Sequence, residues 1–245
     1  MGTYAIGDIH SCFKEFLELK ERIEKKDPNA RFILMGDVIG KGPSDEEMLR
    51  WLYDHITADG KYQMILGNHD DNFMEVFGQG QLETLASLGR EQKEDVKIDR
   101  EEFSHLEDKP EKMFAYAKFL AQQPLVKKIE TNGKKYILAH GWYDPTLQDK
   151  FAYRKCLLIG RQIKKDGSII KHFQGDGKLL IGHIPTAGKI PAAIGTEQGK
   201  IWDFETETYI DCGLVFKVQQ LSHLGKRFGN LAAYELETGH VEYLW

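Results

Sequence analysis

The chain has 245 residues, of which 41% are hydrophobic and 29% are charged, a composition typical of a globular protein with an ordinary core. Its formal net charge of -5 argues against a protein that binds nucleic acid broadly through a basic surface. The three cysteines, Cys12, Cys156 and Cys212, form no Cys-x-x-Cys pair, which argues against a disulfide framework or a zinc knuckle.

Membrane attachment and export are not indicated by the sequence. The first residues, Met1 to Asp8, run directly into an apolar strand and leave no room for a signal peptide. No apolar run approaches the ~20 residues that are needed to span a bilayer. We therefore expect a soluble cytoplasmic protein, whose oligomeric state the sequence leaves open.

The N-terminal part of the chain predicts alternating strands and helices. Apolar runs of strand length occur at 3–6, 31–35 and 62–66. Between them, apolar residues recur at helical spacing over 12–26. A second helix begins at Ser44, where Glu47 completes a capping-box pattern. This β-α-β-α-β order predicts parallel strands joined by right-handed crossovers, with functional loops at one edge of the sheet.

Residues 71–124 break this alternation. They are rich in helix formers and charge, including a charged run over 90–102, and Met113, Tyr116 and Leu120 lie on one helical stripe. We expect a helical insertion on the strand-end side of the sheet, forming a cap within the single domain of residues 1–245. The alternative, that the charged run is only a solvated face, stays open.

Strand patterns return after Pro124. The runs at 126–130 and 135–139 flank Asn132-Gly133, which is a hairpin signal. Residues 142–178 show a mixed pattern. Further strand patterns occur at 178–181, 201–204 and 209–210, and a second hairpin at 231–236 and 241–244. The whole order predicts a mixed α/β (α+β) fold.

Polar side chains follow the predicted strands at the point where each strand ends. They are Asp8, His10, Asp37, Asn68, His69, His140 and His183. A single Gly-Asp or Gly-Asn step is usually a turn and a lone histidine is usually structural, but recurrence at successive strand ends is hard to obtain by chance. Carboxylate, amide and imidazole groups are ligands for manganese, iron and zinc. We therefore predict a metal site in which Asp37 lies between two metal ions and holds them together.

The motifs that carry these residues resemble those of a known family. The calcineurin-like metallophosphoesterases have similar motifs in the same order, which here are Gly7-Asp8-Ile9-His10, Gly36-Asp37, Gly67-Asn68-His69-Asp70, His140-Gly141 and Gly182-His183. The segments 157–161 and 182–186 are similar to the branch of bacterial serine/threonine protein phosphatases and symmetrical diadenosine tetraphosphatases. The resemblance implies a metallophosphoesterase-type β-sandwich flanked by helices.

The resemblance also implies a division of roles. Two divalent or trivalent metal ions are expected, with manganese first and iron or zinc as alternatives. The metal ligands would be Asp8, His10 and Asp37 for one ion, and Asp37, Asn68, His140 and His183 for the other. A metal-bound hydroxide would attack phosphorus between ions roughly 3.5–4 Å apart. The resemblance places Asp37 at the catalytic centre, His69 as the general acid and Arg161 at the phosphoryl oxygens.

The turn after the second strand departs from the family pattern. Gly40 stands where an aspartate normally orients the catalytic histidine, and Lys41 stands where an arginine normally grips phosphate. Lysine can still supply charge to a substrate, but as a point donor and not as a planar fork. Asp70 and Asp71 are the nearby candidates to orient His69 instead.

These features predict a dinuclear metal-dependent phosphatase, in the first place of the serine/threonine protein phosphatase type acting on phosphorylated protein. A symmetrical dinucleotide polyphosphate hydrolase with a small phosphoester substrate is the alternative. Gly40 and Lys41 motivate a further hypothesis, a metal-binding but catalytically weak regulatory protein that binds partners through residues 71–124. A nuclease or phosphodiesterase of the wider superfamily is disfavoured, because no second histidine follows His183 and the chain is acidic.

Overall fold

The computed structural model describes residues 1–94, 96–164, 166–187, 197–219 and 229–244. In these residues the strands form two five-stranded sheets. In spatial order, the first sheet contains β10 (Val241–Leu244), β9 (Leu231–Glu235), β1 (Thr3–Ile6), β2 (Arg31–Leu34) and β3 (Tyr62–Met64). The second sheet contains β4 (Val126–Thr131), β5 (Lys134–Ala139), β6 (Lys178–Ile181), β8 (Glu207–Tyr209) and β7 (Trp202–Asp203).

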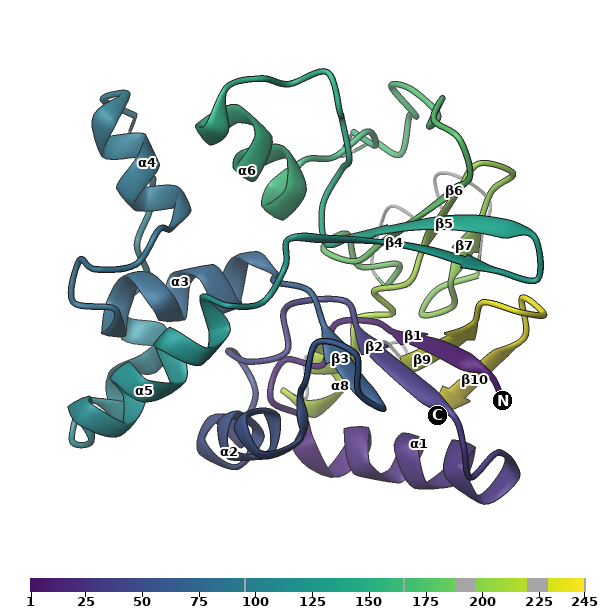
Figure 1. Cartoon of the computed structure of the whole chain (residues 1–245), viewed down its shortest axis with the longest axis horizontal. Coiled ribbons are helices and arrows are strands. Elements are labelled where there is room, and N and C mark those ends of the chain that lie inside the picture. The colour runs from purple at the N-terminus through teal and green to yellow at the C-terminus, as the bar shows by residue number, and fades with distance from the viewer. Residues whose placement is uncertain (95, 165, 188–196, 220–228, 245) are drawn as a thin grey trace.

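Both sheets combine parallel and antiparallel pairs. In the first sheet β1, β2 and β3 are parallel, β9 pairs antiparallel with β1, and β10 pairs antiparallel with β9. In the second sheet β5, β6 and β8 are parallel, and β4 and β7 are antiparallel to their neighbours. Figure 1 shows the two sheets stacked one above the other. Because parallel strands end on the same side of a sheet, the loops that follow them lie close together.

A buried layer between the two sheets holds the sandwich together. Ala5 and Ile33 of the first sheet pack in one cluster with Leu138 and Leu180 of the second, and all four are at most 2% exposed. Because successive side chains of a strand point to opposite faces, Ile6 lies in a different cluster, which packs beneath the helices. Alternate side chains of β1 thus belong to two cores, one between the sheets and one between the first sheet and its helices.

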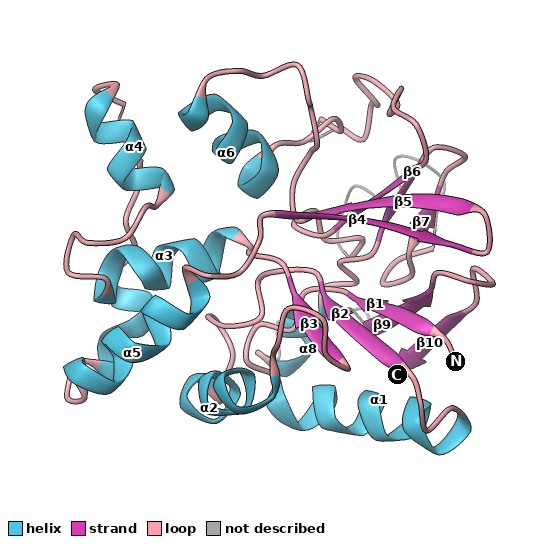
Figure 2. Cartoon of the chain, in the orientation of Figure 1, coloured by secondary structure: helices cyan, strands magenta, loops and turns pink. Residues whose placement is uncertain are grey.

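Helices cover the outer faces and one end of the sandwich. They are α1 (Phe13–Lys26), α2 (Asp45–His55), α3 (Asn68–Phe77), α4 (Leu85–Glu91), the 3₁₀ helix η1 (Glu101–Leu106), α5 (Pro110–Leu120), α6 (Lys150–Ile159) and α8 (Leu214–Val218). α1 packs against β9 and β10, α3 against α5, and α4 against α6. Figure 2 shows α3, α4 and α5 together on the side opposite the two termini. Among the described residues, no helix is long and apolar enough to cross a membrane.

The predicted α/β sandwich is confirmed, and so are the predicted strands, but two local expectations fail. Ser44 precedes α2 without making a capping hydrogen bond through its side chain. The next residue, Asp45, instead turns its carboxylate toward the preceding loop and accepts a hydrogen bond from Gly40 N at 2.8 Å. Helix α6 was not predicted, although Asp149 caps it by accepting from Ala152 N at 2.7 Å. A single cap residue within a mixed pattern was too weak a signal to predict a helix.

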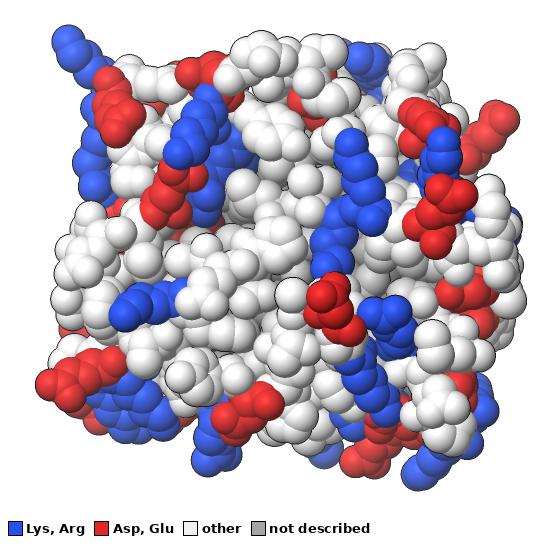
Figure 3. Space-filling model, in the orientation of Figure 1, with Lys and Arg blue, Asp and Glu red and all other residues white. Residues whose placement is uncertain are grey.

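Charged side chains on the surface are largely interspersed. On the face in Figure 3, basic and acidic side chains lie side by side and form no single large basic area. Lys109, just before α5, and Lys112 within it both contact the carboxylate of Glu46 on α2, at 2.5 and 2.7 Å. Exposed pairs of this kind contribute at most about 1 kcal/mol each. The packing of the helices therefore depends mainly on the apolar clusters beneath them.

Glu24 connects α1 to the edge of the first sheet. Its carboxylate accepts hydrogen bonds from Tyr62 Oη at 2.6 Å and from Lys20 Nζ at 2.8 Å, and it pairs with Lys61 Nζ at 2.7 Å. Partial burial opposes ionisation, but the hydrogen bonds from the two lysines lower the pKa of Glu24 to about 2. The ionised form is therefore the one that the fold stabilises.

We expect Glu24→Gln to lower the free energy of unfolding at pH 7 by about 1 kcal/mol. Because the folded pKa lies below the unfolded value of about 4.3, the stabilisation is complete above that value and is lost as pH falls toward 2. Urea denaturation of both proteins between pH 7 and pH 3 measures this. Glu21→Gln, an exposed change on the same helix, is the control. A difference that stays constant over this range would contradict the assignment.

Candidate metal centre

The strand-end residues that the sequence predicts for the site lie together at the seam between the two sheets. Asp8 and His10 follow β1, and Asp37 follows β2. Asn68 and His69 form the first turn of α3, directly after β3. The second sheet supplies its donors from the ends of β5 and β6, which are His140 and His183. Parallel strands thus deliver all of these side chains to one place, as the sequence predicts.

Two compact groups of ligand atoms share one carboxylate. The first group is His10, Asp37 and His69, and the second is Asp37, His140 and His183, with the ligand atoms of each group within 4.8 Å of one another. Asp37 Oδ2 lies 3.7 Å from His10 Nε2 and 3.9 Å from His69 Nε2. Its other oxygen, Oδ1, lies 3.3 Å from His140 Nε2. Asp37 therefore presents one oxygen to each group.

Asn68 and Asp8 lie beside these groups. The amide oxygen of Asn68 is 3.2 Å from His140 Nε2, so it adds a neutral donor to the second group. Asp8 accepts from His183 N at 3.2 and 3.3 Å, and its Oδ1 is 4.0 Å from His140 Nδ1. Asp8 thus contacts the second group, and its assignment as a ligand of the first ion stays a prediction.

Glycines before the site residues permit this close approach. A Cβ atom on Gly67 would lie 2.1 Å from Asp37 N, and one on Gly182 would lie 2.4 Å from Asp8 Oδ1. Asp37 and His183 have φ angles of 47° and 61°, in the left-handed region that non-glycine residues rarely adopt. Such strained positions cluster at functional sites, where the surrounding structure holds them. The glycine that precedes several of the polar site residues in the sequence is therefore explained by this crowding.

Two of the histidines, His10 and His183, are held in the neutral state that binds metal. Burial lowers the pKa values of His10 and His183 to about 3, which keeps their imidazoles neutral. His140 donates from Nδ1 to Met35 O at 2.9 Å, which leaves its Nε2 directed at Asp37 and Asn68. His10 Nδ1 is buried and has no hydrogen-bond partner among the described residues. The other ring nitrogen of His10, Nε2, is the one that faces Asp37.

The electrostatics of the cluster favour a cation. Burial lowers the pKa of His140, but the carboxylates of Asp37 and Asp8 outweigh it and raise the value to about 10. Burial and the neighbouring carboxylate of Asp211 raise the pKa of Asp8 well above its usual range. Carboxylates this close need positive charge between them. Oxygen and imidazole donors in such a field fit ions such as manganese, iron or zinc.

Two cationic side chains lie at the rim, each next to a different group. Lys41 Nζ is 3.4 Å from His10 Nε2, and Arg161 Nη2 is 3.3 Å from His183 Nε2. Lys41 lines a cavity of about 80 Å³ whose walls include Asp8, Asp37, His69, Asp211 and Phe216. An anion bound in this cavity would therefore meet the positive charge of Lys41, whereas Arg161 contacts His183 from outside the cavity wall.

The expectation that Asp70 or Asp71 orients His69 is wrong. Asp70 accepts from the backbone amides of Val38 and Gly67, at 3.1 and 2.8 Å, and so shapes the loop around Asp37. Asp71 forms a buried ion pair with Arg154, whose Nε donates to it at 3.0 Å. The partner of His69 is instead Glu102, with Oε1 at 2.5 Å from Nδ1.

Sequence reasoning missed two residues of the site. Glu102 lies within the charged run of the predicted insertion, and nothing local distinguishes it from surface glutamates. Asp211 follows β8, is 5% exposed, and lines the same cavity as Asp8. Its signal was present, because the apolar pair Tyr209-Ile210 precedes it as at the other strand ends. It lacks only the preceding glycine.

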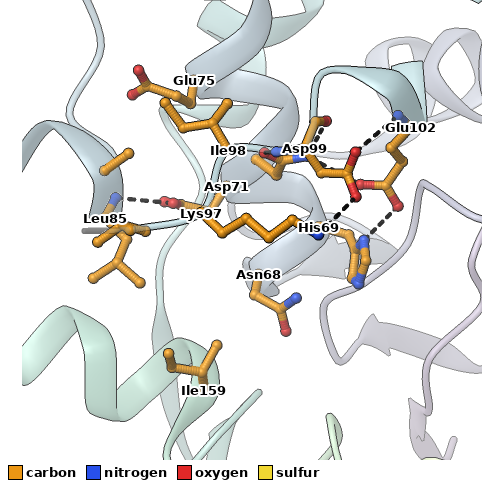
Figure 4. A pocket seen from close by; sticks show the side chains of 13 residues that line it. Asn68, His69, Asp71, Glu75, Leu85, Lys97, Ile98, Asp99, Glu102 and Ile159 are labelled. Atoms are coloured by element: carbon orange, nitrogen blue, oxygen red, sulfur yellow. Dashed lines mark hydrogen bonds and ion pairs between the residues drawn. The ribbon is translucent and has the colours of Figure 1, made fainter. Parts of the chain in front are cut away.

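A second cavity of about 270 Å³ opens beside His69, between α3, α4 and the segment that leads to η1. Figure 4 shows Leu85, Ile98 and Ile159 around it. The carboxylates of Asp71 and Glu75 in its wall are paired with arginines, Arg154 and Arg90. The rest of its wall combines those apolar side chains with the charged side chains of Lys97, Asp99 and Glu102.

A two-sheet sandwich flanked by helices, with such donors at the ends of its parallel strands, is the arrangement of the metallophosphoesterases. The chain belongs to the calcineurin-like phosphoesterase family, whose model matches residues 1–219. Members of this family generally use two divalent metal ions, and the two donor groups around Asp37 are candidate ligands for such ions.

Relatives and solved structures agree with this assignment. A symmetrical bis(5'-nucleosyl)-tetraphosphatase of Erwinia tasmaniensis is 30% identical over 146 residues, which are 59% of this chain and 46% of the relative. The same-named protein of Methylobacillus flagellatus is 43% identical over 70 residues, 29% of this chain and 24% of the relative. The chain therefore aligns with half or less of the length of these relatives.

Two solved structures share the fold at low sequence identity. A metallophosphoesterase from Sphaerobacter thermophilus has a TM-score of 0.52 at 15% identity, over 99% of this chain and 86% of that one. A serine/threonine phosphatase from Saccharomyces cerevisiae has a TM-score of 0.53 at 14% identity, over 100% of this chain and 79% of that one. At this identity the likeness concerns the fold alone.

We expect Asp37→Asn to weaken metal binding at both groups, because its two oxygens face different groups. Isothermal titration of metal-stripped protein with Mn²⁺ should show two ions bound by the native chain. The variant should lose affinity at both sites by about 100-fold or more, beyond the effect of an outer-shell change. Asp176→Asn, the same substitution at an exposed residue, is the control. Loss at one site alone would show that Asp37 does not bridge.

Proposed function

We propose that the chain is a dinuclear metal-dependent hydrolase of phosphoesters. The observation that carries this proposal is the shared carboxylate of Asp37, one oxygen of which faces each group of donors. One ion would be held by Asp8, His10 and Asp37, and the other by Asp37, Asn68, His140 and His183. Manganese is the first candidate, with iron or zinc as alternatives. Such a pair lowers the pKa of the attacking water and neutralises charge on the phosphoryl group.

The protein's own side chains have complementary tasks. His69 directs Nε2 into the site and would give a proton to the leaving oxygen. Arg161 and Lys41 would hold phosphoryl oxygens, the arginine through a planar fork and the lysine as a single point charge. Their placement next to different donor groups supports contacts to different oxygens of one substrate.

Two substrate classes remain, each supported by a separate observation. The names of the relatives support a symmetrical dinucleoside tetraphosphate, and we take this as the first candidate. The apolar side chains in the cavity beside His69 support an uncharged leaving group, such as the alcohol of phosphorylated serine or threonine in a protein.

The hypothesis of a catalytically weak regulatory protein loses part of its motivation. It rested on Gly40, which removes the usual carboxylate beside His69. The contact between His69 and Glu102 places a carboxylate at that imidazole from another element. Residues 71–124, which include Glu102 and much of the second cavity, are thus proposed to be a cap that takes part in the active site.

We expect manganese-loaded protein to convert a symmetrical dinucleoside tetraphosphate to two nucleoside diphosphates, which chromatography of the nucleotides measures. Phosphate release from phosphoserine and phosphothreonine peptides under the same conditions tests the second class. The higher kcat/KM decides between them. Asp37→Asn should reduce both activities to background, which controls for contaminating phosphatases. Native protein with no hydrolysis of either class, or of an aryl phosphate, would refute the proposed function.

A further inference from the structure

We propose that Glu102 is a positioning residue for His69, and that it supplies from η1 the carboxylate that Gly40 cannot supply. This inference rests on the proposed function, because it concerns the histidine that would protonate the leaving group. Figure 4 shows Glu102 reaching from η1 to the imidazole of His69, although the two residues are far apart in the sequence.

The contact determines which nitrogen of His69 takes part in proton transfer. Glu102 Oε1 lies 2.5 Å from His69 Nδ1. An ionised carboxylate can only accept, so Nδ1 carries the hydrogen and donates it. The other nitrogen, Nε2, then faces the donor cluster, 3.9 Å from Asp37 Oδ2. The imidazole is thus held in one orientation, with Nδ1–H directed at Glu102. As a general acid it would be doubly protonated, would give the Nε2 proton to the leaving oxygen, and would keep the hydrogen on Nδ1.

Glu102 is itself held in place through both of its oxygens. Its Oε2 accepts from Asn72 Nδ2 at 3.0 Å. Asn72 and His69 are three residues apart on α3, so one face of this helix engages both oxygens of the carboxylate. The Asp99 side chain completes the arrangement, since Asp99 Oδ1 accepts from Glu102 N at 3.3 Å. The Glu102 side chain is only 8% exposed. Contacts to both carboxylate oxygens therefore define its position.

The carboxylate of Glu102 lies where a side chain at position 40 would be. A Cβ atom on Gly40 would lie 2.5 Å from Glu102 Oε1 and 3.3 Å from His69 Nδ1. Gly40 also has a φ of 85°, in the region that favours glycine. A side chain at position 40 would therefore displace Glu102. The absence of a side chain at Gly40 therefore leaves room for the Glu102 carboxylate to reach His69.

The first test reads the state of His69 directly and needs no activity. Metal-free protein with ¹⁵N-labelled histidine should show His69 with a hydrogen on Nδ1 and a strongly deshielded proton there, assigned by its loss in His69→Asn. Glu102→Ala should remove the deshielded proton and mix the tautomers. Glu101→Gln, an exposed neighbour on η1, should leave the spectrum unchanged. The same His69 signals in Glu102→Ala would overturn the inference.

The second test uses the leaving group. Glu102→Gln and Glu102→Ala should lower kcat by about 10–100-fold on an alkyl phosphate, whose alkoxide needs a proton, with little change in KM. On dinitrophenyl phosphate, whose leaving group needs no proton, kcat should stay close to the native value. A purely structural role would lower both rates together and would overturn the inference. Because Gln matches Glu in size, its variant keeps the test valid if the alanine variant is unstable.

The two proposals fail in different ways. If the native protein hydrolyses no phosphoester, the proposed function fails, and the spectrum of His69 still decides whether Glu102 orients it. If hydrolysis proceeds and the Glu102 variants match the native enzyme on both substrates, the proposed function stands and the role of Glu102 is refuted. Mn²⁺ titration of Glu102→Gln should still show native affinity, which separates positioning of His69 from damage to the metal site.

Discussion

The site depends on the charge of one buried carboxylate. Asp37 is 2% exposed, and burial alone would raise its pKa, yet His140 and His69 hold that pKa well below the usual range. A carboxylate so far from water is stable only if donors and positive charge surround it. The backbone amide of His69 supplies one donor at 2.9 Å. The imidazoles that converge on Asp37 come from both sheets. The packing of the two sheets therefore determines whether the site forms.

Much of this arrangement could be predicted, because it leaves a local trace. Each apolar run of strand length ends in a polar residue, and close approach of the chains requires glycine before several of them, such as Asn68 and His183. The trace is therefore a glycine followed by a polar residue after four of the strands, at Gly7-Asp8, Gly36-Asp37, Gly67-Asn68 and Gly182-His183. It indicates both the edge of the sheet and the kind of ligand there. The family resemblance added the roles of the residues, which spacing alone does not supply.

The rest depends on contacts between distant parts of the chain. Glu94 and Glu102 belong to one charged run, yet Glu94 pairs with Lys155 at the surface and Glu102 turns inward to His69. Their local sequences do not distinguish these outcomes, because the partner elements are placed by the tertiary fold. The missed helix α6 is a similar case, since its packing against α4 is not visible in its own sequence.

The origin of the donors has a consequence for how long the folded protein lasts. Asp37 ends a strand of the first sheet, whereas His140 and His183 end strands of the second. An ion held by all three would crosslink the two halves of the sandwich, and it would have no preformed site in the unfolded chain. Its binding free energy would therefore add to the free energy of folding. Metal-free protein would then unfold more readily and would be cleaved sooner by proteases.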